Sequence, residues 1–240
     1  MAQHGHVAGS GGSALTVTFS VAGRCSRTGQ LGAATATSDI AVGSRVPHAR
    51  ANVGAVLTQH RTDPLLGPRG LDLLQSGCEA DSAVRALVAS TGHHAWRQLA
   101  AVDSRGRTAA FSGSRVQPHG TEGFSAEEFG DGCVGLGNML ANDHVGPAMR
   151  KAFEGSEDEP LAERLVRALE AGAAAGGERL PVRSAALLVA GDQLFPLVDL
   201  RVDLSDQALS DLRRTWDAYR PLAGEFLIRA LDPDNAGTGS

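Results

Sequence analysis

Apolar and polar positions alternate in short runs through the first half of the chain and again near its end. Such runs, rich in β-branched and small apolar residues and bounded by glycine or polar turns, predict β-strands. We expect strands at residues 17–22, 31–37, 53–59, 98–102, 108–112, 133–138, 185–190 and 197–202. The polar, glycine-containing turns at 27–30 and 103–106 are typical of antiparallel hairpins.

Between these runs, apolar residues recur at helical spacing. We expect helices at residues 69–75, 79–90, 143–154, 161–171 and 206–219. Pro68 stands where a first helical turn tolerates proline, and Gly77 follows the end of the same helix. Because strands come in clusters separated by pairs of helices, the order predicts an α+β fold of antiparallel sheets covered by helices, not a doubly wound parallel sheet.

The first fifteen residues differ from the rest of the chain. Residues 1–15 are polar and glycine-rich, so we expect a disordered leader that buries too little apolar surface to fold. They lack the basic start and apolar stretch of a signal peptide. We expect residues 16–231 to form a single domain and residues 232–240 a flexible tail.

Composition narrows the class of partner. Hydrophobic residues make up 42% of the chain, enough for a real core, yet none of the apolar runs reaches membrane-spanning length. The net charge is −5 and the basic residues are scattered arginines, which argues against nucleic acid. Three cysteines without C-x-x-C spacing suggest a reducing, cytoplasmic setting. We therefore expect a small-molecule substrate and, as the commonest symmetric assembly, a homodimer.

Several signatures of common enzyme classes are missing. The sequence has no strand-associated G-x-G-x-x-G, no P-loop lysine and no G-x-S-x-G elbow. Its histidines and carboxylates do not show the spacing of a metal site. We expect neither a cofactor nor a metal.

One ordered set of segments is more specific. The segments, in chain order, are 18–22, 28–32, 41–44 with 46–47, 67–74, 137–140, 174–177 with 184–189, and 199–203. Together they resemble the bacterial domain-of-unknown-function family 1028, which is placed in the N-terminal nucleophile (Ntn) hydrolase superfamily. The resemblance implies a four-layer αββα sandwich of antiparallel sheets, with Thr18 in the nucleophile position. Glu178 stands at a position that is usually aspartate in the family.

Thr18 suggests a specific chemistry. If the chain were removed up to Val17, the α-amino group of Thr18 could act as the base for its own hydroxyl. Asn138 and Gln59 are the candidate amide donors to a developing oxyanion. The alternatives are an ordinary strand threonine and amides that satisfy turn backbone groups.

A second group of polar residues offers attack without a processed terminus. Thr37, Ser38 and Asp39 lie together at a predicted strand end, close in sequence to Arg45 and His48. They suggest an acid/base or carboxylate-binding corner. Ordinary turn chemistry is the alternative.

Five further residues complete the candidate set. His60 and Asp63 suggest a base and its orienting carboxylate, or a surface loop, and Arg69 suggests a carboxylate contact or a structural ion pair. The resemblance adds His119, because the family often has a histidine near this place. Glu178 is included as a substrate-binding candidate.

The sequence thus predicts a cofactor-independent hydrolase of a small amide, ureido or cyclic-imide-like substrate. The alternative is a non-hydrolytic enzyme or a small-molecule binding protein on the same scaffold, in which the N-terminal nucleophile has been lost.

Overall fold

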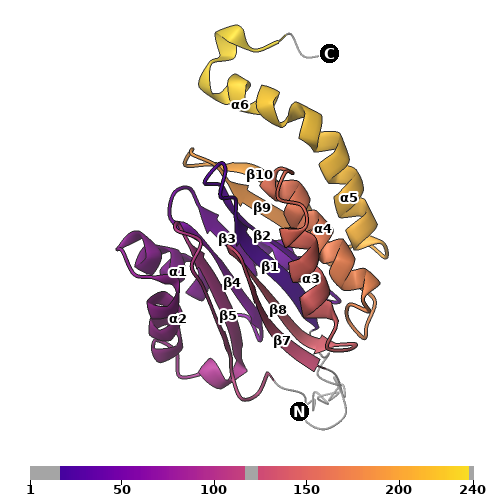
Figure 1. The fold of residues 1–240 in the computed structure, drawn as a ribbon. Coiled ribbons are helices and arrows are strands. Elements are labelled where there is room, and N and C mark those ends of the chain that lie inside the picture. Colours follow the sequence, from indigo (N-terminus) through magenta and orange to yellow (C-terminus); the bar gives the residue numbers. More distant parts are fainter. Residues whose placement is uncertain (1–16, 117–123, 238–240) are drawn as a thin grey trace, which may run out of the picture.

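The computed structural model describes residues 17–116 and 124–237 of the chain. Its strands form two antiparallel sheets, one of six strands in the order β10-β9-β2-β1-β8-β7 and one of four in the order β3-β4-β5-β6 (Figure 1). The six-stranded sheet consists of β10 (Pro196–Val202), β9 (Ser184–Ala190), β2 (Leu31–Thr37), β1 (Thr18–Arg24), β8 (Cys133–Leu140) and β7 (Phe124–Gly130). The other sheet consists of β3 (Pro47–Arg50), β4 (Gly54–His60), β5 (Arg97–Asp103) and β6 (Thr108–Ser112).

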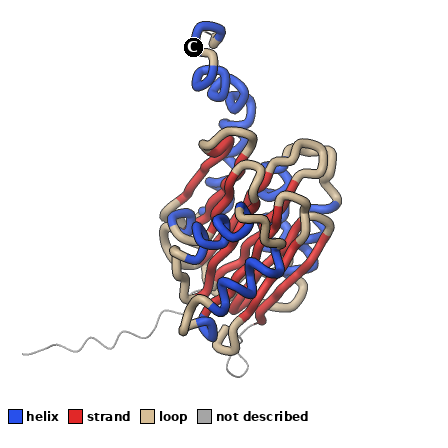
Figure 2. Tube along the Cα trace, turned by 90° about the vertical axis from the view of Figure 1, so that its left-hand side faces the viewer, coloured by secondary structure: helices blue, strands red, loops and turns tan. Residues whose placement is uncertain are grey.

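Helices cover the outer face of each sheet (Figures 1 and 2). The four-stranded sheet carries α1 (Leu66–Gln75) and α2 (Ala80–Ala89). The six-stranded sheet carries α3 (Val145–Glu154), α4 (Leu161–Ala174) and α5 (Ala208–Tyr219). The predicted four-layer αββα sandwich is confirmed.

Among the strands and α-helices of the described residues, three were not predicted from the sequence: β3, β7 and α6 (Ala223–Leu231). β3 is short and includes a histidine and an arginine, and β7 contains two adjacent glutamates, so neither shows a clean apolar run. α6 extends from the body of the molecule and buries none of its residues (Figures 1 and 2). No helix within residues 17–116 and 124–237 combines the length and hydropathy needed to cross a membrane.

The two faces of β1 meet different layers. Phe19 and Val21 pack in the core beneath α3 and α4, whereas Ala22 belongs to the core between the two sheets. Because side chains alternate along a strand, Thr18 and Ser20 share the inter-sheet face of Ala22. The space between the sheets is therefore apolar near the end of β1 and polar near its start.

Gly23, close to the end of β1, tests the packing of the helix layer. A Cβ atom added there would lie 2.5 Å from Cζ of the fully buried Phe153. We expect Gly23→Ala to lower the free energy of unfolding by about 2 kcal/mol, because the ring must move within a close-packed core. Urea denaturation measures this cost. The cost should shrink in a Phe153→Leu background, and equal costs in both backgrounds would contradict a clash with this ring.

Candidate functional site

Thr18 is the first residue of β1, an inner strand of the six-stranded sheet. In the register of the sheet it lies opposite Thr37 of β2 on one side and Asn138 of β8 on the other. All three residues are buried. Three candidates that are far apart in sequence thus meet at the polar end of the inter-sheet space.

The two threonine hydroxyls form a short relay. Thr18 Oγ1 donates to Thr37 Oγ1 at 3.2 Å, and Thr37 Oγ1 donates to the carbonyl oxygen of Val17. The nitrogen of Thr18 belongs to the peptide bond with Val17, so it cannot accept a proton. With Val17 in place, the Thr18 hydroxyl is therefore hydrogen-bonded but has no base beside it among these contacts.

Ser20, two residues along β1, connects the two sheets. Its hydroxyl donates toward Thr35 Oγ1 at 2.7 Å and toward Gln59 Oε1 of β4 at 2.6 Å. A single hydroxyl hydrogen can serve one of these acceptors at a time, and the Thr35 hydroxyl can donate in return. All three side chains are fully buried. The predicted candidate Gln59 is thereby linked to the start of β1.

Gln98 of β5 fixes the orientation of the amides around it. Its Nε2 donates to the carbonyl oxygen of Gly137 at 2.8 Å, a group that can only accept. Its Oε1 must then accept from Gln59 Nε2 at 2.8 Å and from Asn138 Nδ2 at 3.0 Å. A flipped Asn138 amide would put two acceptors against each other, so the contacts assign this orientation.

This orientation determines what Asn138 offers to a ligand. Its amide nitrogen is used by Gln98, and its Oδ1 is buried with no hydrogen-bond partner among the described residues. A buried polar atom without a partner is rare and costly. Asn138 thus presents a hydrogen-bond acceptor beside Thr18.

Glu178 lies next to this cluster. Its Oε2 accepts a hydrogen bond from the backbone N–H of Ser38 at 2.8 Å. Part of the residue contacts solvent, but Oε1 is buried and has no partner among the described residues. Burial raises the pKa of the Glu178 carboxyl to about 9, against the opposing effect of the hydrogen bonds from Ser38. The carboxyl group is therefore protonated at neutral pH.

The residues of the predicted corner after β2 lie near one another, and their contacts extend outward from Thr37. The backbone N–H of Asp39 donates to Thr37 Oγ1 at 3.3 Å, and the Asp39 carboxylate pairs with Arg45 at 3.0 Å. His48 Nε2 lies 3.4 Å from the carbonyl oxygen of Arg45. Burial lowers the pKa of His48, against the opposing effect of the hydrogen bond to the carbonyl oxygen of Arg45, so the imidazole is neutral at pH 7.

The remaining candidates have other surroundings. His60 stacks on Trp96 and its Nδ1 lies 2.9 Å from the Trp96 carbonyl oxygen, whereas the Asp63 carboxylate lies 3.8 Å from Arg97. The structure thus gives the predicted base and carboxylate different partners.

Arg69 donates to Ser90 at 3.0 Å, a contact between the end of α2 and the exposed side of α1. It is not brought to the start of β1. His119 lies outside the described residues.

The polar cluster around Thr18 consists of Thr18, Ser20, Thr35, Thr37, Gln59, Gln98 and Asn138. Three of its members were not singled out from the sequence: Ser20, Thr35 and Gln98. For two of them the sequence contains a signal, because side chains two residues apart along a strand lie on the same face. Ser20 and Thr35 therefore share the face of Thr18 and Thr37. Gln98 stands at the start of an apolar strand, where a polar residue reads as a strand boundary. Only the pairing of β4 with β5, which sets Gln98 opposite Gln59, gives it a place in the cluster.

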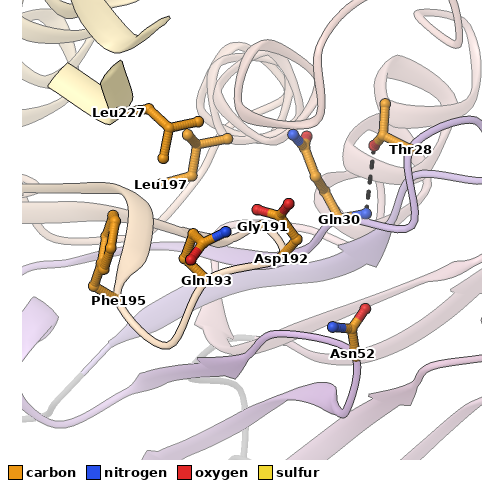
Figure 3. A pocket seen from close by; sticks show the side chains of 9 residues that line it. All are labelled: Thr28, Gln30, Asn52, Gly191, Asp192, Gln193, Phe195, Leu197 and Leu227. Carbon is orange, nitrogen blue, oxygen red and sulfur yellow. Dashed lines mark hydrogen bonds between the residues drawn. The ribbon is translucent and has the colours of Figure 1, made fainter. Parts of the chain in front are cut away.

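A separate cavity lies at the other end of the sandwich. It has a volume of about 250 Å³ and is lined by residues that include Gln30, Asn52, Asp192 and Phe195 (Figure 3). Gln30 precedes β2, at the end of that strand remote from Thr37, so about 20 Å of strand separates the cavity from Thr18. The cavity is thus distinct from the polar cluster around Thr18.

Fold and site together define an αββα-sandwich protein whose polar cluster surrounds the first residue of an inner strand. Comparison with known proteins agrees with this class. The model of the family of unknown function DUF1028 matches residues 18–212, and the chain belongs to that family. No match was found among curated proteins.

Two solved structures are similar to this chain. The crystal structure of protein SPO2555 from Silicibacter pomeroyi, a DUF1028 protein, is 31% identical with a TM-score of 0.76, and the match covers 85% of this chain and 89% of that one. Anbu (ancestral beta-subunit) from Yersinia bercovieri is 10% identical with a TM-score of 0.40, and the match covers 87% of this chain and 96% of that one.

Proposed function

We propose that this protein is a cofactor-independent, Ntn-type hydrolase of a small amide, ureido or cyclic-imide-like substrate, with Thr18 as the nucleophile after removal of residues 1–17. The observation that carries the proposal is the hydroxyl of Thr18 at the start of an inner strand, 3.2 Å from the hydroxyl of Thr37 and beside Asn138. The match to the family model begins at Thr18 itself, which supports the same boundary.

The proposed chemistry needs only groups that the chain supplies. Thr18 Oγ attacks the substrate carbonyl carbon, and its proton passes to the freed α-amino group and then to the leaving nitrogen. Water then releases the acyl group from Oγ. Removal of Val17 also takes away the carbonyl oxygen to which Thr37 donates, which frees the Thr37 hydroxyl to serve the reacting atoms.

The neighbouring residues have supporting roles in this proposal. Ser38, Asp39, Arg45 and His48 form the wall beyond Thr37, where a polar or acidic substrate group can bind. Gln59 holds the cluster through Ser20 and Gln98. The cytoplasmic location and the symmetric homodimer stay predictions.

A second candidate function is favoured by one observation. With Val17 in place, Thr18 is only 3% exposed, and its hydroxyl is already bonded to Thr37. A binding protein or a non-hydrolytic enzyme with a lost nucleophile would have this arrangement. Activity of the chain with residues 1–17 still attached would exclude the free-amine mechanism and favour this candidate.

Two matched chains test the nucleophile. One begins at Thr18 and the other at Val17, each released from a fusion by a protease that cleaves directly before the first residue. Each chain is treated with an electrophilic β-lactone, which acylates an activated hydroxyl and adds its full mass. We expect one adduct at residue 18 in the chain that begins at Thr18, and at least a tenfold slower reaction in the chain that keeps Val17, because one general base contributes about 10²- to 10⁴-fold.

Substitutions in the chain that begins at residue 18 complete the test. Thr18→Ala should lose the adduct, and Thr18→Ser, which keeps a hydroxyl, should retain it. Peptide mapping of the modified site and turnover of a panel of small amides, ureido compounds and cyclic imides give the readouts. Equal labelling of Thr18→Ala would remove Thr18 from the chemistry, and equal labelling of the chain that keeps Val17 would exclude the free α-amino group as its base.

A further inference from the structure

Glu178 occupies a particular place at the edge of β1. Leu140, in β8, is paired with Phe124 of β7 on one side and with Glu178 on the other, which is the side of β1. The backbone N–H of Ala141 also donates to the carbonyl oxygen of Gly177 at 3.0 Å. Since Thr18 pairs with Asn138 two residues earlier, Glu178 lies in line with β1, just beyond its first residue.

The side chain of Glu178 reaches across the same point. Its Oε2 accepts from the N–H of Ser38, which directly follows the residue opposite Thr18 on β2. Glu178 therefore contacts β8 through its backbone and the residue after β2 through its side chain, and so crosses the line along which β1 runs. A terminus created at Thr18 would begin against this residue.

Two buried acceptors without partners among the described residues lie around this point: Glu178 Oε1 and Asn138 Oδ1. In the orientation assigned above, Asn138 Oδ1 can only accept an N–H donor, and Glu178 Oε1 becomes an acceptor when the carboxyl gives its proton to an amine. When the chain begins at Thr18, its nitrogen is a free α-amino group with up to three N–H donors. Such donors would give the two oxygens the hydrogen-bond partners that they lack.

We propose that Glu178 anchors the α-amino group of Thr18, with Asn138 Oδ1 as a second acceptor, and thereby aims the nitrogen at the Thr18 hydroxyl. This inference rests on the free terminus of the proposed function, and it gives Glu178 a role toward the amine and not toward the substrate. The ammonium would pair with a carboxylate that is costly to ionise alone, since burial raises its pKa in the chain with Val17 attached.

Periodate oxidation provides a test that needs no substrate. Periodate cleaves the carbon–carbon bond between the amine and hydroxyl carbons of an N-terminal threonine and reacts with the uncharged amine. The pH at which the rate rises therefore reports the pKa of the Thr18 amine, and intact mass follows the reaction. The chain that begins at Thr18 is compared with its Glu178→Gln variant.

We expect Glu178→Gln to move this inflection down by about one pH unit or more, because an opposite charge at contact distance stabilises the ammonium form. Glu178→Asp keeps the charge but withdraws it by one methylene, so its inflection should fall between the two. The control Glu127→Gln changes an exposed residue on β7 of the same sheet and should leave the inflection unchanged.

An unchanged inflection in Glu178→Gln would overturn the anchor. If circular dichroism shows that this variant is unfolded, Glu178→Asp decides, and the absence of any downward shift in it overturns the anchor as well. Failure of the proposed function is distinguishable. A chain in which the shift is present but residue 18 is not acylated by the β-lactone keeps the anchor and loses the hydrolase.

Discussion

Glu178→Gln is expected to stabilise the chain with Val17 attached by about 3 kcal/mol at pH 7, because burial raises the pKa of this carboxyl from its ordinary value of 4.5 to about 9. Glutamine reproduces the protonated form of the side chain. It keeps an oxygen for the N–H of Ser38 and places an N–H₂ group where the protonated Oε1 lies.

The sign of the effect follows from the two pKa values. Below pH 4.5 the carboxyl is protonated in both the folded and the unfolded chain, so the wild type and Glu178→Gln differ little. As the pH rises, the unfolded chain ionises and the folded chain does not. The wild type then loses about 1.4 kcal/mol of stability per pH unit until the folded carboxyl itself ionises.

Urea denaturation at pH 4.5, 7 and 9 measures this difference. We expect the gap between the variant and the wild type to be close to zero at the lowest pH and to widen steadily toward the highest. The exposed control Glu127→Gln should show no such trend. A constant gap across the three pH values would mean that the Glu178 carboxyl is ionised in the folded chain.

A stabilising substitution at this place would have a functional meaning. Core positions are usually occupied by residues that favour folding, and residues that cost stability concentrate at sites of binding and catalysis. The buried oxygens of Glu178 and Asn138 that lack partners among the described residues both lie at the start of β1, and the other two such side-chain atoms are the Nε atoms of Arg24 and Arg97. The two unpartnered acceptors among these atoms therefore lie at the candidate site.

The sequence predicts the strands that carry this site better than the hydrogen bonds within it. The strand signal in Thr18 to Ala22 and in Leu31 to Thr37 is strong because small and apolar residues fill both faces of these inner strands. The same reasoning does not predict the edge strand β7. Its adjacent Glu127 and Glu128 break the pattern, and its place is set by pairing with β8.

The hydrogen bonds of the site join residues that are far apart in the chain. Gln98 is a strand-boundary residue by its neighbours alone, yet it orients two amides from different sheets. Glu178 follows a pair of glycines in what reads as a flexible connection, and neither its burial nor its place in line with β1 has a local signal. Such tertiary features are set by sheet pairing, which periodicity does not report.

Glu163, on α4, should behave in the opposite way to Glu178. Burial alone would raise its pKa, but hydrogen bonds from Arg213, Trp216 and Arg167 outweigh this effect and lower the pKa to about 2. Trp216 Nε1 donates to Oε2 at 2.7 Å and Arg213 donates to the same oxygen at 2.8 Å, while Arg167 donates to Oε1 at 2.6 Å. This carboxylate joins α4 to α5 in the outer helix layer.

We expect Glu163→Gln to lower the free energy of unfolding by about 3 kcal/mol at pH 7, because the variant lacks the charge that these donors stabilise. The loss should be present above pH 4.5 and should disappear as the pH falls to about 2, where the wild-type carboxylate also becomes protonated. Urea denaturation at neutral and acidic pH measures both limits.

A control on the same helix pair separates charge from packing. Glu170→Gln removes a more exposed partner of Arg213 and should cost no more than about 1 kcal/mol, since solvent screens that pair. An undiminished loss for Glu163→Gln at pH 2 would assign its effect to packing and not to charge. With the expected result, the ionised Glu163 stabilises the outer helix layer, whereas the protonated Glu178 lowers the stability of the fold at the start of β1. Of these two buried acids, Glu163 would then have a structural role and Glu178 a functional one.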